Sequence, residues 1–201
     1  MISAVLLNGS KVFPEALSRV AQKAILDDLR VLAQQAPFRR YETPSGNKMS
    51  VRMSAAGDYG WMTNKDGYEY ANAQPDGRKW PDIPGSILEV WNRFSNVGCG
   101  PDSCLINFYT EGARMGLHQD KDEADLSMPV VSISLGDDAL FRIGGLNRTD
   151  PTQSIWLKSG DVAVLAGDAR LAFHGIDRIR FKSSSLLPAG GRINITLRVA
   201  R

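Results

Sequence analysis

The chain has 201 residues, of which 43% are hydrophobic and 23% charged, and this is enough to bury one core in a single domain. Its formal net charge of +2 is far from the strongly basic balance of a protein that coats nucleic acid, so any nucleic-acid contact should be local. Cys99 and Cys104 are too few and too close together for a disulfide framework, which favours a reducing cytoplasm. The stretch from Met1 to Asn8 has no signal-peptide or membrane-span pattern, and we expect no membrane partner.

Two helices are predicted in the first half of the chain. The first begins at Pro14, because proline suits the first helical position, and Pro37 ends it. Its apolar stripe at helical spacing consists of Leu17, Val20, Ala21, Ala24, Ile25 and Leu32. The second begins with a capping box at Ser86-Ile87-Leu88-Glu89 and stops at Gly98. Its inward side chains are Val90, Trp91, Phe94 and Val97.

Short β-strands are predicted for most of the remaining chain. Residues 43–76 are rich in glycine and tyrosine and are typical of antiparallel hairpins that form a lid. From Ser103 onward we expect about eight short strands with turn signals between them. The turn signals are Glu111-Gly112, Gly136-Asp137, Gly144-Gly145, Ser159-Gly160-Asp161 and Gly167-Asp168. Such strands indicate a sandwich or barrel, and a jelly roll of two facing sheets is the version that binds a ligand between them.

Both histidines of the chain fall in one pattern, because His118-Gln119-Asp120 is followed by His174. Residues i and i+2 of a strand point to the same side, so His118 and Asp120 can reach one metal together. Two imidazoles and one carboxylate form the face that holds non-haem Fe(II) and leaves positions free for a co-substrate and O₂. The alternative is that the histidines are satisfied core or surface groups, since His-x-Asp alone arises by chance in many proteins.

The segment 192–199 alternates polar and apolar residues without a break, which predicts a strand. One face carries the polar residues Arg192, Asn194, Thr196 and Arg198. A solvated sheet face is the ordinary explanation of such a row. The alternative is a pocket wall, because two guanidiniums on one face suit a small dicarboxylate through charge-assisted bonds. Asn107 and Tyr109, two residues apart in the predicted strand 103–109, would add a neutral donor at each end of that ligand.

Several motifs in chain order together resemble one known family. The motifs are Asn107-Phe108-Tyr109, His118-Gln119-Asp120-Lys121-Asp122-Glu123, Val131-Ser132-Ile133-Ser134-Leu135-Gly136, Phe173-His174-Gly175-Ile176 and Arg192-x-Asn194-x-x-x-Arg198. They resemble the bacterial DNA-repair branch of the AlkB family of Fe(II)- and 2-oxoglutarate-dependent dioxygenases. Upstream, Met49-Ser50-Val51, Gly60-Trp61 and Gly67-Tyr68-x-Tyr70 resemble the nucleotide-recognition lid of that branch. The resemblance covers the chain from Pro37 to Arg198, except that residues 178–189 do not align with the family pattern.

The resemblance implies a fold that is mainly β with flanking helices (α+β), a double-stranded β-helix or cupin-like jelly roll. Residues 1–201 would form a single catalytic domain, with N-terminal helices and the lid over residues 1–102 and the dioxygenase core over residues 103–201. The metal ligands would lie near the mouth of the jelly roll, and Arg192 and Arg198 deeper.

The resemblance also implies a role for each site residue. His118, Asp120 and His174 would be the metal-binding and catalytic residues. Arg192 with Tyr109 would bind the distal carboxylate of 2-oxoglutarate, Arg198 with Asn107 would bind the carboxylate next to the keto group, and Asn194 would support that pocket. Trp61 would stack on the target base, Tyr68 would contact a substrate phosphate, Asp122 would lie beside the base, and Met49 and Met53 would complete the substrate site.

The implied reaction is oxidative demethylation of N-alkylated bases, such as N1-methyladenine and N3-methylcytosine, which releases formaldehyde, succinate and CO₂. It would require Fe(II), 2-oxoglutarate and O₂. The implied partner is alkylated DNA, with RNA left open, in a single strand or with the base flipped out, because a stacked duplex hides the target atom. We expect a cytoplasmic monomer.

Three other classes of protein remain as alternatives. A 2-oxoglutarate-dependent hydroxylase acting on a protein or small metabolite would keep the metal residues and the arginines but would not need the lid aromatics. A cupin-like metal or ligand carrier would not need the paired arginines. A nucleic-acid-binding module would not need the metal residues.

Overall fold

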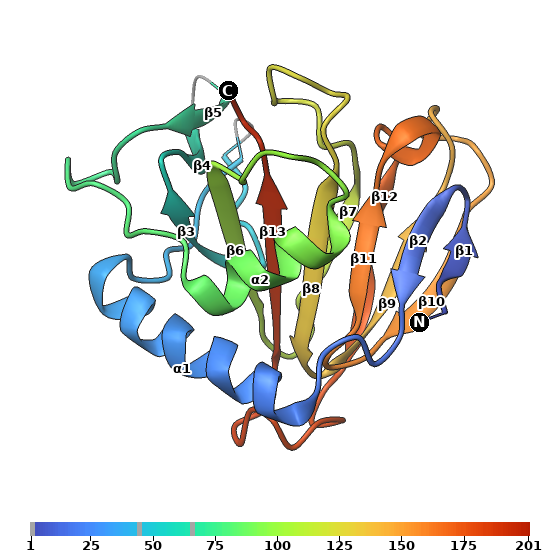
Figure 1. Ribbon diagram of the computed structural model, residues 1–201, viewed down its shortest axis with the longest axis horizontal. Helices are drawn as coiled ribbons and strands as arrows, with labels where there is room; N and C mark the ends of the chain where they lie inside the picture. Colours follow the sequence, from blue (N-terminus) through green and yellow to red (C-terminus); the bar gives the residue numbers. More distant parts are fainter. Residues whose placement is uncertain (1–2, 44–45, 65–66) are drawn as a thin grey trace.

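The computed structural model of the chain describes residues 3–43, 46–64 and 67–201. Three antiparallel sheets run through these residues (Figure 1). The major sheet contains, in spatial order, β1 (Val5–Leu7), β2 (Ser10–Phe13), β11 (Val162–Leu165), β8 (Val130–Gly136), β13 (Arg192–Arg198), β6 (Ser103–Tyr109) and β3 (Arg52–Gly57). The minor sheet contains β10 (Gln153–Leu157), β9 (Asp138–Ile143), β12 (His174–Arg180) and β7 (Met115–His118). The strands β4 (Gly60–Asn64) and β5 (Gly67–Ala71) pair only with each other.

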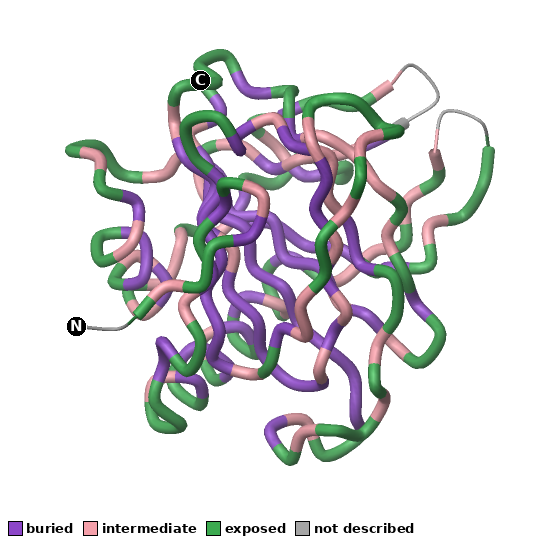
Figure 2. Tube along the Cα trace, turned by 90° about the vertical axis from the view of Figure 1, so that its right-hand side faces the viewer, coloured by how far each residue is buried: buried purple, intermediate pink, exposed green. Residues whose placement is uncertain are grey.

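The strands from Ser103 to Arg198 pass repeatedly between the major and minor sheets, in the order expected of a jelly roll. Eight strands lie in this part of the chain, all of which the structure describes, and the predicted number is confirmed. The predicted fold class, α+β with a jelly-roll core, is also confirmed. Figure 2 shows the buried residues concentrated in the central strands, with exposed residues in the connecting loops.

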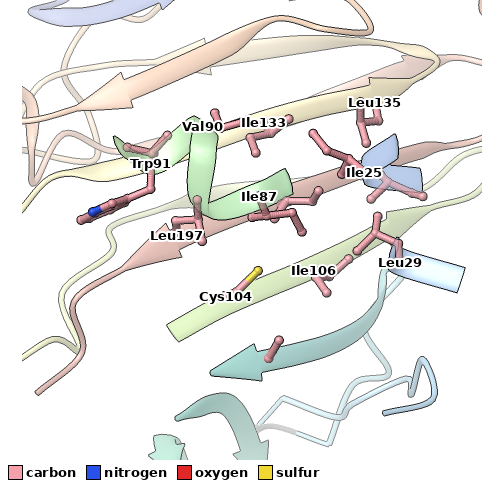
Figure 3. Packing of buried hydrophobic residues seen from close by; sticks show 14 of the residues in the cluster. Ile25, Leu29, Ile87, Val90, Trp91, Cys104, Ile106, Ile133, Leu135 and Leu197 are labelled. Atoms are coloured by element: carbon pink, nitrogen blue, oxygen red, sulfur yellow. The ribbon is translucent and has the colours of Figure 1, made fainter. Parts of the chain in front are cut away.

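Two helices, α1 (Arg19–Gln35) and α2 (Gly85–Phe94), cover the outer face of the major sheet (Figure 1). Figure 3 shows Ile25 and Leu29 of α1 and Trp91 of α2 packed over the strands. The strand residues beneath them are Cys104, Ile106, Ile133, Leu135 and Leu197. A second apolar cluster, which includes Phe141 and Leu165, lies between the two sheets. No helix of the described residues is long and apolar enough to cross a membrane.

The predicted start of the first helix is wrong, and part of its stripe is wrong as well. Helix α1 begins at Arg19, because Phe13 still belongs to β2 and the Ser18 hydroxyl accepts a hydrogen bond from the backbone N–H of Ala21. Val20 is 78% exposed and therefore does not belong to the buried face. The predicted end is confirmed, since the helix stops at Gln35, two residues before Pro37.

The capping box predicted for the second helix is also wrong. The N-cap of α2 is Pro84, and the Ser86 hydroxyl donates to Asp28 of α1 instead of capping its own helix. The helix ends at Phe94, before the predicted stop at Gly98, and Asn96 takes the left-handed backbone conformation with φ 56°.

The predicted lid contains one hairpin, β4–β5, and one strand, β3, that belongs to the major sheet. Strand β3 pairs with β6 at the edge of the major sheet, because its small apolar residues Ala55 and Ala56 are buried against the core. Residues 44–45 and 65–66 of the predicted lid lie outside the described residues. The hairpin that remains is the part of the lid that faces the cavity described below.

The segment 178–189, which contains none of the motifs that carry the resemblance, is held by one buried carboxylate. Strand β12 continues to Arg180, and the loop after it turns around Asp137, which is 1% exposed. The Asp137 carboxylate accepts hydrogen bonds from the backbone N–H groups of Lys182, Ser184 and Gly191. A buried carboxylate with three such donors fixes the chain just before β13 begins.

Asp137→Ala should therefore lower the free energy of unfolding by at least about 2 kcal/mol, because hydrogen bonds to a charged group contribute about 1.5–3 kcal/mol each and three backbone N–H groups, that of Gly191 buried, lose their acceptor. The matched control is Asp177→Ala, since Asp177 forms an exposed pair with Arg142 at 3.5 Å and such pairs contribute about 1 kcal/mol at most. Urea unfolding of both variants measures the difference. Equal stability of the two variants would contradict the assigned role of Asp137.

Candidate active site

A cavity of about 590 Å³ opens between the inner faces of the two sheets, beside the β4–β5 hairpin. The polar face of β13 lines it, through Arg192, Asn194, Thr196 and Arg198. All four of these residues are buried, with exposed fractions between 1% and 9%. The polar row of this strand is therefore a pocket wall, as the second of the two interpretations predicted, and not a solvated sheet face.

The cavity brings together the three predicted metal ligands. One ligand atom from each of His118, Asp120 and His174 lies within 4.8 Å of the other two. The two histidines are cross-strand partners, since His118 ends β7 and His174 begins β12. Asp120 lies two residues beyond the end of β7, so it reaches the group from a loop and not from the extended strand that the His-x-Asp spacing suggested. The prediction that the three side chains converge is confirmed, and the prediction that Asp120 lies in the same strand as His118 is wrong.

Backbone carbonyls orient both imidazoles. Nδ1 of His118 lies 2.9 Å from the carbonyl oxygen of Gly116, and Nδ1 of His174 lies 2.9 Å from that of Ala172. A carbonyl only accepts, so each Nδ1 carries the proton and each Nε2 has a free lone pair. Both Nε2 atoms lie 3.8 Å from the Asp120 carboxylate oxygens, on the side where a metal would be bound.

The protonation states of these groups suit a divalent cation. Burial lowers the pKa of His174 to about 4, so its imidazole is neutral at physiological pH. Burial by itself would raise the pKa of Asp120, but Arg198 together with His174 and His118 outweighs that effect and holds the pKa below its usual value. A neutral imidazole and an ionised carboxylate are the forms that bind metal. The donor set of two nitrogens and one carboxylate fits non-haem Fe(II).

The two buried arginines have unused donors. Within the described part of the chain, Nε and Nη1 of both Arg192 and Arg198 are buried donors without a hydrogen-bond partner, and Oδ1 of Asn107 is a buried acceptor without one. Buried donors of this kind are costly unless a ligand satisfies them. Arg192 also places its guanidinium carbon 5.2 Å from the Tyr109 ring centroid. This donor set fits a small dicarboxylate such as 2-oxoglutarate.

Arg198 has a second task that the sequence did not indicate. Its Nη2 donates to Asp120 Oδ2 at 2.8 Å, and its Nε lies 3.2 Å from Glu123 Oε1. Arg192, in contrast, forms one hydrogen bond to the Ser134 hydroxyl at 3.0 Å. Arg198 is thus joined to a predicted metal ligand, and Arg192 is not.

Of the two remaining polar residues of the β13 wall, Thr196 donates to Asn194 Oδ1 at 3.3 Å and Asn194 is tied to the neighbouring strand. Its side-chain nitrogen donates to the Ser132 hydroxyl at 2.7 Å and to the Ile133 carbonyl at 3.2 Å. Asn194 supports the wall, as predicted. The polar residues Ser132 and Ser134 alternate with apolar residues in β8, and this alternation was a signal for pocket-facing side chains.

The five predicted substrate residues all line the cavity: Met49, Met53, Trp61, Tyr68 and Asp122. Trp61 donates from Nε1 to Asp122 Oδ2 at 3.0 Å, which joins the hairpin to the loop of the metal ligands. Tyr68 stacks on Trp61, with ring centroids 5.2 Å apart and an interplanar angle of 19°. Tyr68 is 50% exposed, so it stands at the mouth of the cavity, whereas Met53 is 2% exposed and lies inside.

Two buried residues near the metal ligands were missed by sequence reasoning. Glu123 belongs to a run of charges that reads as a solvated surface, yet only 2% of its side chain is exposed. Arg170 is also buried; it donates to Glu123 at 2.9 Å and to the backbone carbonyl of Asp120 at 2.6 Å. No spacing in the sequence distinguishes either residue from its exposed neighbours.

Comparison with known proteins agrees with this geometry. Residues 9–198 match the 2OG-Fe(II) oxygenase superfamily. The chain is 55% identical over 194 residues to the alpha-ketoglutarate-dependent dioxygenase AlkB homolog of Caulobacter vibrioides, covering 96% of this chain and 88% of that protein. It is 42% identical over 185 residues to the alpha-ketoglutarate-dependent dioxygenase AlkB of Escherichia coli, covering 90% and 85%.

A solved structure shows the same relationship in three dimensions. The structure of OsALKBH1 superposes with a TM-score of 0.77 at 31% identity, covering 96% of this chain and 99% of that one. The chain therefore belongs to the AlkB family of Fe(II)- and 2-oxoglutarate-dependent dioxygenases.

Proposed function

We propose that this enzyme oxidatively demethylates N-alkylated bases in DNA, such as N1-methyladenine and N3-methylcytosine, and so reverses alkylation damage directly. The observation that supports this most strongly is the β4–β5 hairpin, whose Trp61 and Tyr68 line the same cavity as His118, Asp120 and His174. A hydroxylase for a small metabolite has no need of stacked aromatic rings beside its metal. An aromatic platform next to an oxidising centre suits a flipped or unpaired base.

The side chains of the cavity have separate tasks in this reaction. Fe(II) with 2-oxoglutarate and O₂ would supply an oxidation that hydroxylates the N-methyl carbon and yields formaldehyde, succinate, CO₂ and the restored base. Arg192 and Tyr109 bind the distal carboxylate of 2-oxoglutarate. Arg198 and Asn107 bind the carboxylate next to the keto group, and Arg198 holds Asp120 at the same time through their 2.8 Å hydrogen bond.

On the hairpin side, Trp61 stacks on the base, and Tyr68, at the cavity mouth, contacts a phosphate beside it. Met49 and Met53 line the same cavity and provide apolar contact. Extracting a base from a duplex costs a few kcal/mol, and stacking on an aromatic ring returns about 1–3 kcal/mol. The substrate is therefore a single strand or a base flipped out of a duplex, in DNA with RNA as a second substrate class.

We also propose that the enzyme acts as a monomer in the cytoplasm. Cys99 and Cys104 are both free, which is consistent with a reducing compartment. The small net charge of +2 favours a short contact around one base over extended coating of a strand. The experiment that tests the proposed reaction supplies the purified protein with Fe(II), 2-oxoglutarate, O₂ and a panel of methylated oligonucleotides.

Formaldehyde and the restored base are expected from methylated oligonucleotides, and neither is expected when 2-oxoglutarate is omitted. Other outcomes point to the other classes of protein. Succinate that appears only with a protein or metabolite would indicate a different hydroxylase. Metal binding without turnover of any substrate would indicate a carrier, and oligonucleotide affinity that is indifferent to metal and co-substrate would indicate a binding module.

The site should also distinguish bases by their charge, because N1-methyladenine and N3-methylcytosine are cations near neutral pH and undamaged bases are not. A cation over an aromatic face gains about 0.5–2 kcal/mol, so Trp61→Ala should lower kcat/KM for cationic lesions about twofold to thirtyfold. Asp122→Ala should act in the same direction. Neutral lesions such as N1-methylguanine should lose less.

Asp122→Asn is the matched control for charge, since it keeps the size of the side chain and an oxygen that can accept the Trp61 N–H. The measurement compares kcat/KM for both lesion classes in one oligonucleotide context at fixed salt, because phosphate contacts are salt-dependent. An equal loss for cationic and neutral lesions in all three variants would leave Trp61 and Asp122 as residues that recognise shape alone.

A further inference from the structure

A buried hydrogen-bond network extends from the hairpin to the metal site, and the reaction described above does not use it. Tyr70 of β5 is 7% exposed, and its hydroxyl donates to Glu123 Oε1 at 2.6 Å. Glu123 accepts from Arg170 Nη2 at 2.9 Å through its other oxygen. Arg198 Nε lies 3.2 Å from the oxygen that Tyr70 also contacts. Glu123 is thus the point where the hairpin meets the groups that hold Asp120.

Both arginines of this network also bind Asp120. Arg198 Nη2 donates to the Asp120 carboxylate at 2.8 Å, and Arg170 Nη1 donates to the Asp120 backbone carbonyl at 2.6 Å. Arg198 is therefore paired with both carboxylates, through a hydrogen bond to Asp120 and at ion-pair distance from Glu123. The Tyr70 hydroxyl supplies one hydrogen bond to the Glu123 carboxylate. Glu123 then needs less stabilisation from Arg198, and the Arg198 guanidinium can interact more strongly with Asp120.

Besides the Tyr70 contact, the hairpin is attached to the rest of the protein by side-chain hydrogen bonds such as those of Trp61 to Asp122 and of Thr63 to the Glu42 carbonyl. Strands β4 and β5 form a sheet of their own, outside the ladders of the major and minor sheets. Tyr70 lies on the same hairpin as Trp61 and Tyr68, the residues that would contact a base. If the hairpin moved away, the buried Glu123 carboxylate would lose a donor, and a buried charged group with a missing partner is destabilised. The position of the hairpin and the arrangement around Asp120 are thus energetically linked.

We propose that Tyr70 and Glu123 are positioning residues that couple the β4–β5 hairpin to the metal ligand Asp120, so that substrate engagement at the hairpin and co-substrate binding at the metal strengthen each other. Such coupling is reciprocal: each ligand must raise the affinity for the other by the same factor. Loading the metal site should therefore stabilise the closed hairpin even without nucleic acid. The part of this proposal that concerns substrate rests on the proposed function, and the part that concerns metal and 2-oxoglutarate does not.

The first test uses hydrogen exchange and requires no nucleic acid. The intact protein is compared with Tyr70→Phe, which removes only the hydroxyl, and with Tyr59→Phe as a matched control. The guanidinium carbon of Arg201 lies 6.0 Å from the Tyr59 ring centroid and 5.7 Å from the Tyr70 ring centroid. The Tyr59 hydroxyl, however, forms no hydrogen bond among the described residues. Exchange of the β4 and β5 amides is measured anaerobically, with and without Fe(II) and 2-oxoglutarate.

Loading should slow this exchange about fivefold or more in the intact protein and in Tyr59→Phe, since couplings between two sites are typically about 5- to 150-fold. In Tyr70→Phe the slowing on loading should fall below about twofold, so that the ratio of the loaded and unloaded exchange rates changes. A hairpin that responds equally in Tyr70→Phe, or that does not respond in the intact protein, would overturn the proposal. A purely structural role of Tyr70 would raise exchange in both states and leave their ratio unchanged.

The second test measures the dissociation constant of 2-oxoglutarate by anaerobic calorimetry, with and without a single-stranded oligonucleotide that contains N1-methyladenine. The oligonucleotide should tighten 2-oxoglutarate binding in the intact protein and in Tyr59→Phe, and should change it less than about twofold in Tyr70→Phe. Glu123→Gln should lose the same coupling, and the double variant Tyr70→Phe/Glu123→Gln should lose no more, because residues of one network are not additive.

The two tests separate failure of the inference from failure of the proposed function. If the intact protein releases formaldehyde from the oligonucleotide but Tyr70→Phe keeps the full coupling, the inference is wrong and the function stands. If no methylated oligonucleotide is turned over, the proposed function is wrong, and hydrogen exchange still decides whether Tyr70 couples the hairpin to the metal site.

Discussion

Replacement of His118, Asp120 or His174 by alanine should abolish turnover, with formaldehyde release falling more than about a hundredfold. Each substitution removes one of the three side chains whose ligand atoms lie within 4.8 Å of one another, and even partners one shell further from a metal contribute about 10- to 100-fold in affinity or activity. Folding should mostly survive, because the two apolar clusters do not include these residues. The measurements are bound iron, formaldehyde release and thermal unfolding of each variant.

The matched control for this series is Asp125→Ala. Asp125 is an exposed carboxylate in the same loop, and its hydrogen bonds go to Ser127. Iron content and turnover should be unchanged in this variant. Near-native formaldehyde release from any one of the three ligand variants, at ordinary iron concentrations, would show that the metal site has been assigned to the wrong residues.

The second large effect is expected at the two arginines of β13. Arg192→Ala and Arg198→Ala should each raise the dissociation constant of 2-oxoglutarate about tenfold to more than a hundredfold, because a hydrogen bond to a charged group contributes about 1.5–3 kcal/mol. Arg142→Ala is the control, since Arg142 is 40% exposed in a surface ion pair whose contribution is about 1 kcal/mol at most. Calorimetric titration of the metal-loaded protein without O₂ measures the three constants.

The structure predicts a further difference between the two arginine variants. Arg198 donates to Asp120 at 2.8 Å, so Arg198→Ala should also weaken metal binding, whereas Arg192 bonds to Ser134 and its loss should leave metal affinity unchanged. An unchanged 2-oxoglutarate constant in either variant would remove that arginine from the co-substrate pocket. Equal metal affinity in both variants would mean that the Arg198–Asp120 contact does not position the metal ligand.

The parts of this structure that the sequence predicted well are those with a strict geometric period. Alternation in 192–198 places four polar side chains on one wall of the cavity, and β13 is central in its sheet, so both faces are buried. The convergence of the two histidines follows from strand pairing, which brings His118 and His174 opposite each other across a distance of many residues. The sequence spacing did not indicate this pairing, and the prediction that the two histidines converge came from the family resemblance.

The parts that the sequence did not predict depend on contacts between distant segments. Glu123 and Asp122 are neighbours in one charged run, but Glu123 is buried by Arg170 and Arg198 while Asp122 is exposed beside Trp61. The partners lie tens of residues away, and local composition does not show which of the two carboxylates they will cover. The predicted start of α1 was wrong for a similar reason, because β2 pairs with β11 and this pairing keeps Phe13 in a strand.

The proposed function requires that the cavity with the metal ligands is the site where methylated bases are oxidised. The most direct measurement follows formaldehyde and succinate in the same reaction, with Fe(II), 2-oxoglutarate, O₂ and a single-stranded oligonucleotide that carries one N1-methyladenine. The two products should form in equal amounts, omission of 2-oxoglutarate should stop both, and His174→Ala should form neither. Succinate that accumulates without formaldehyde, for every methylated base supplied, would contradict the proposed function.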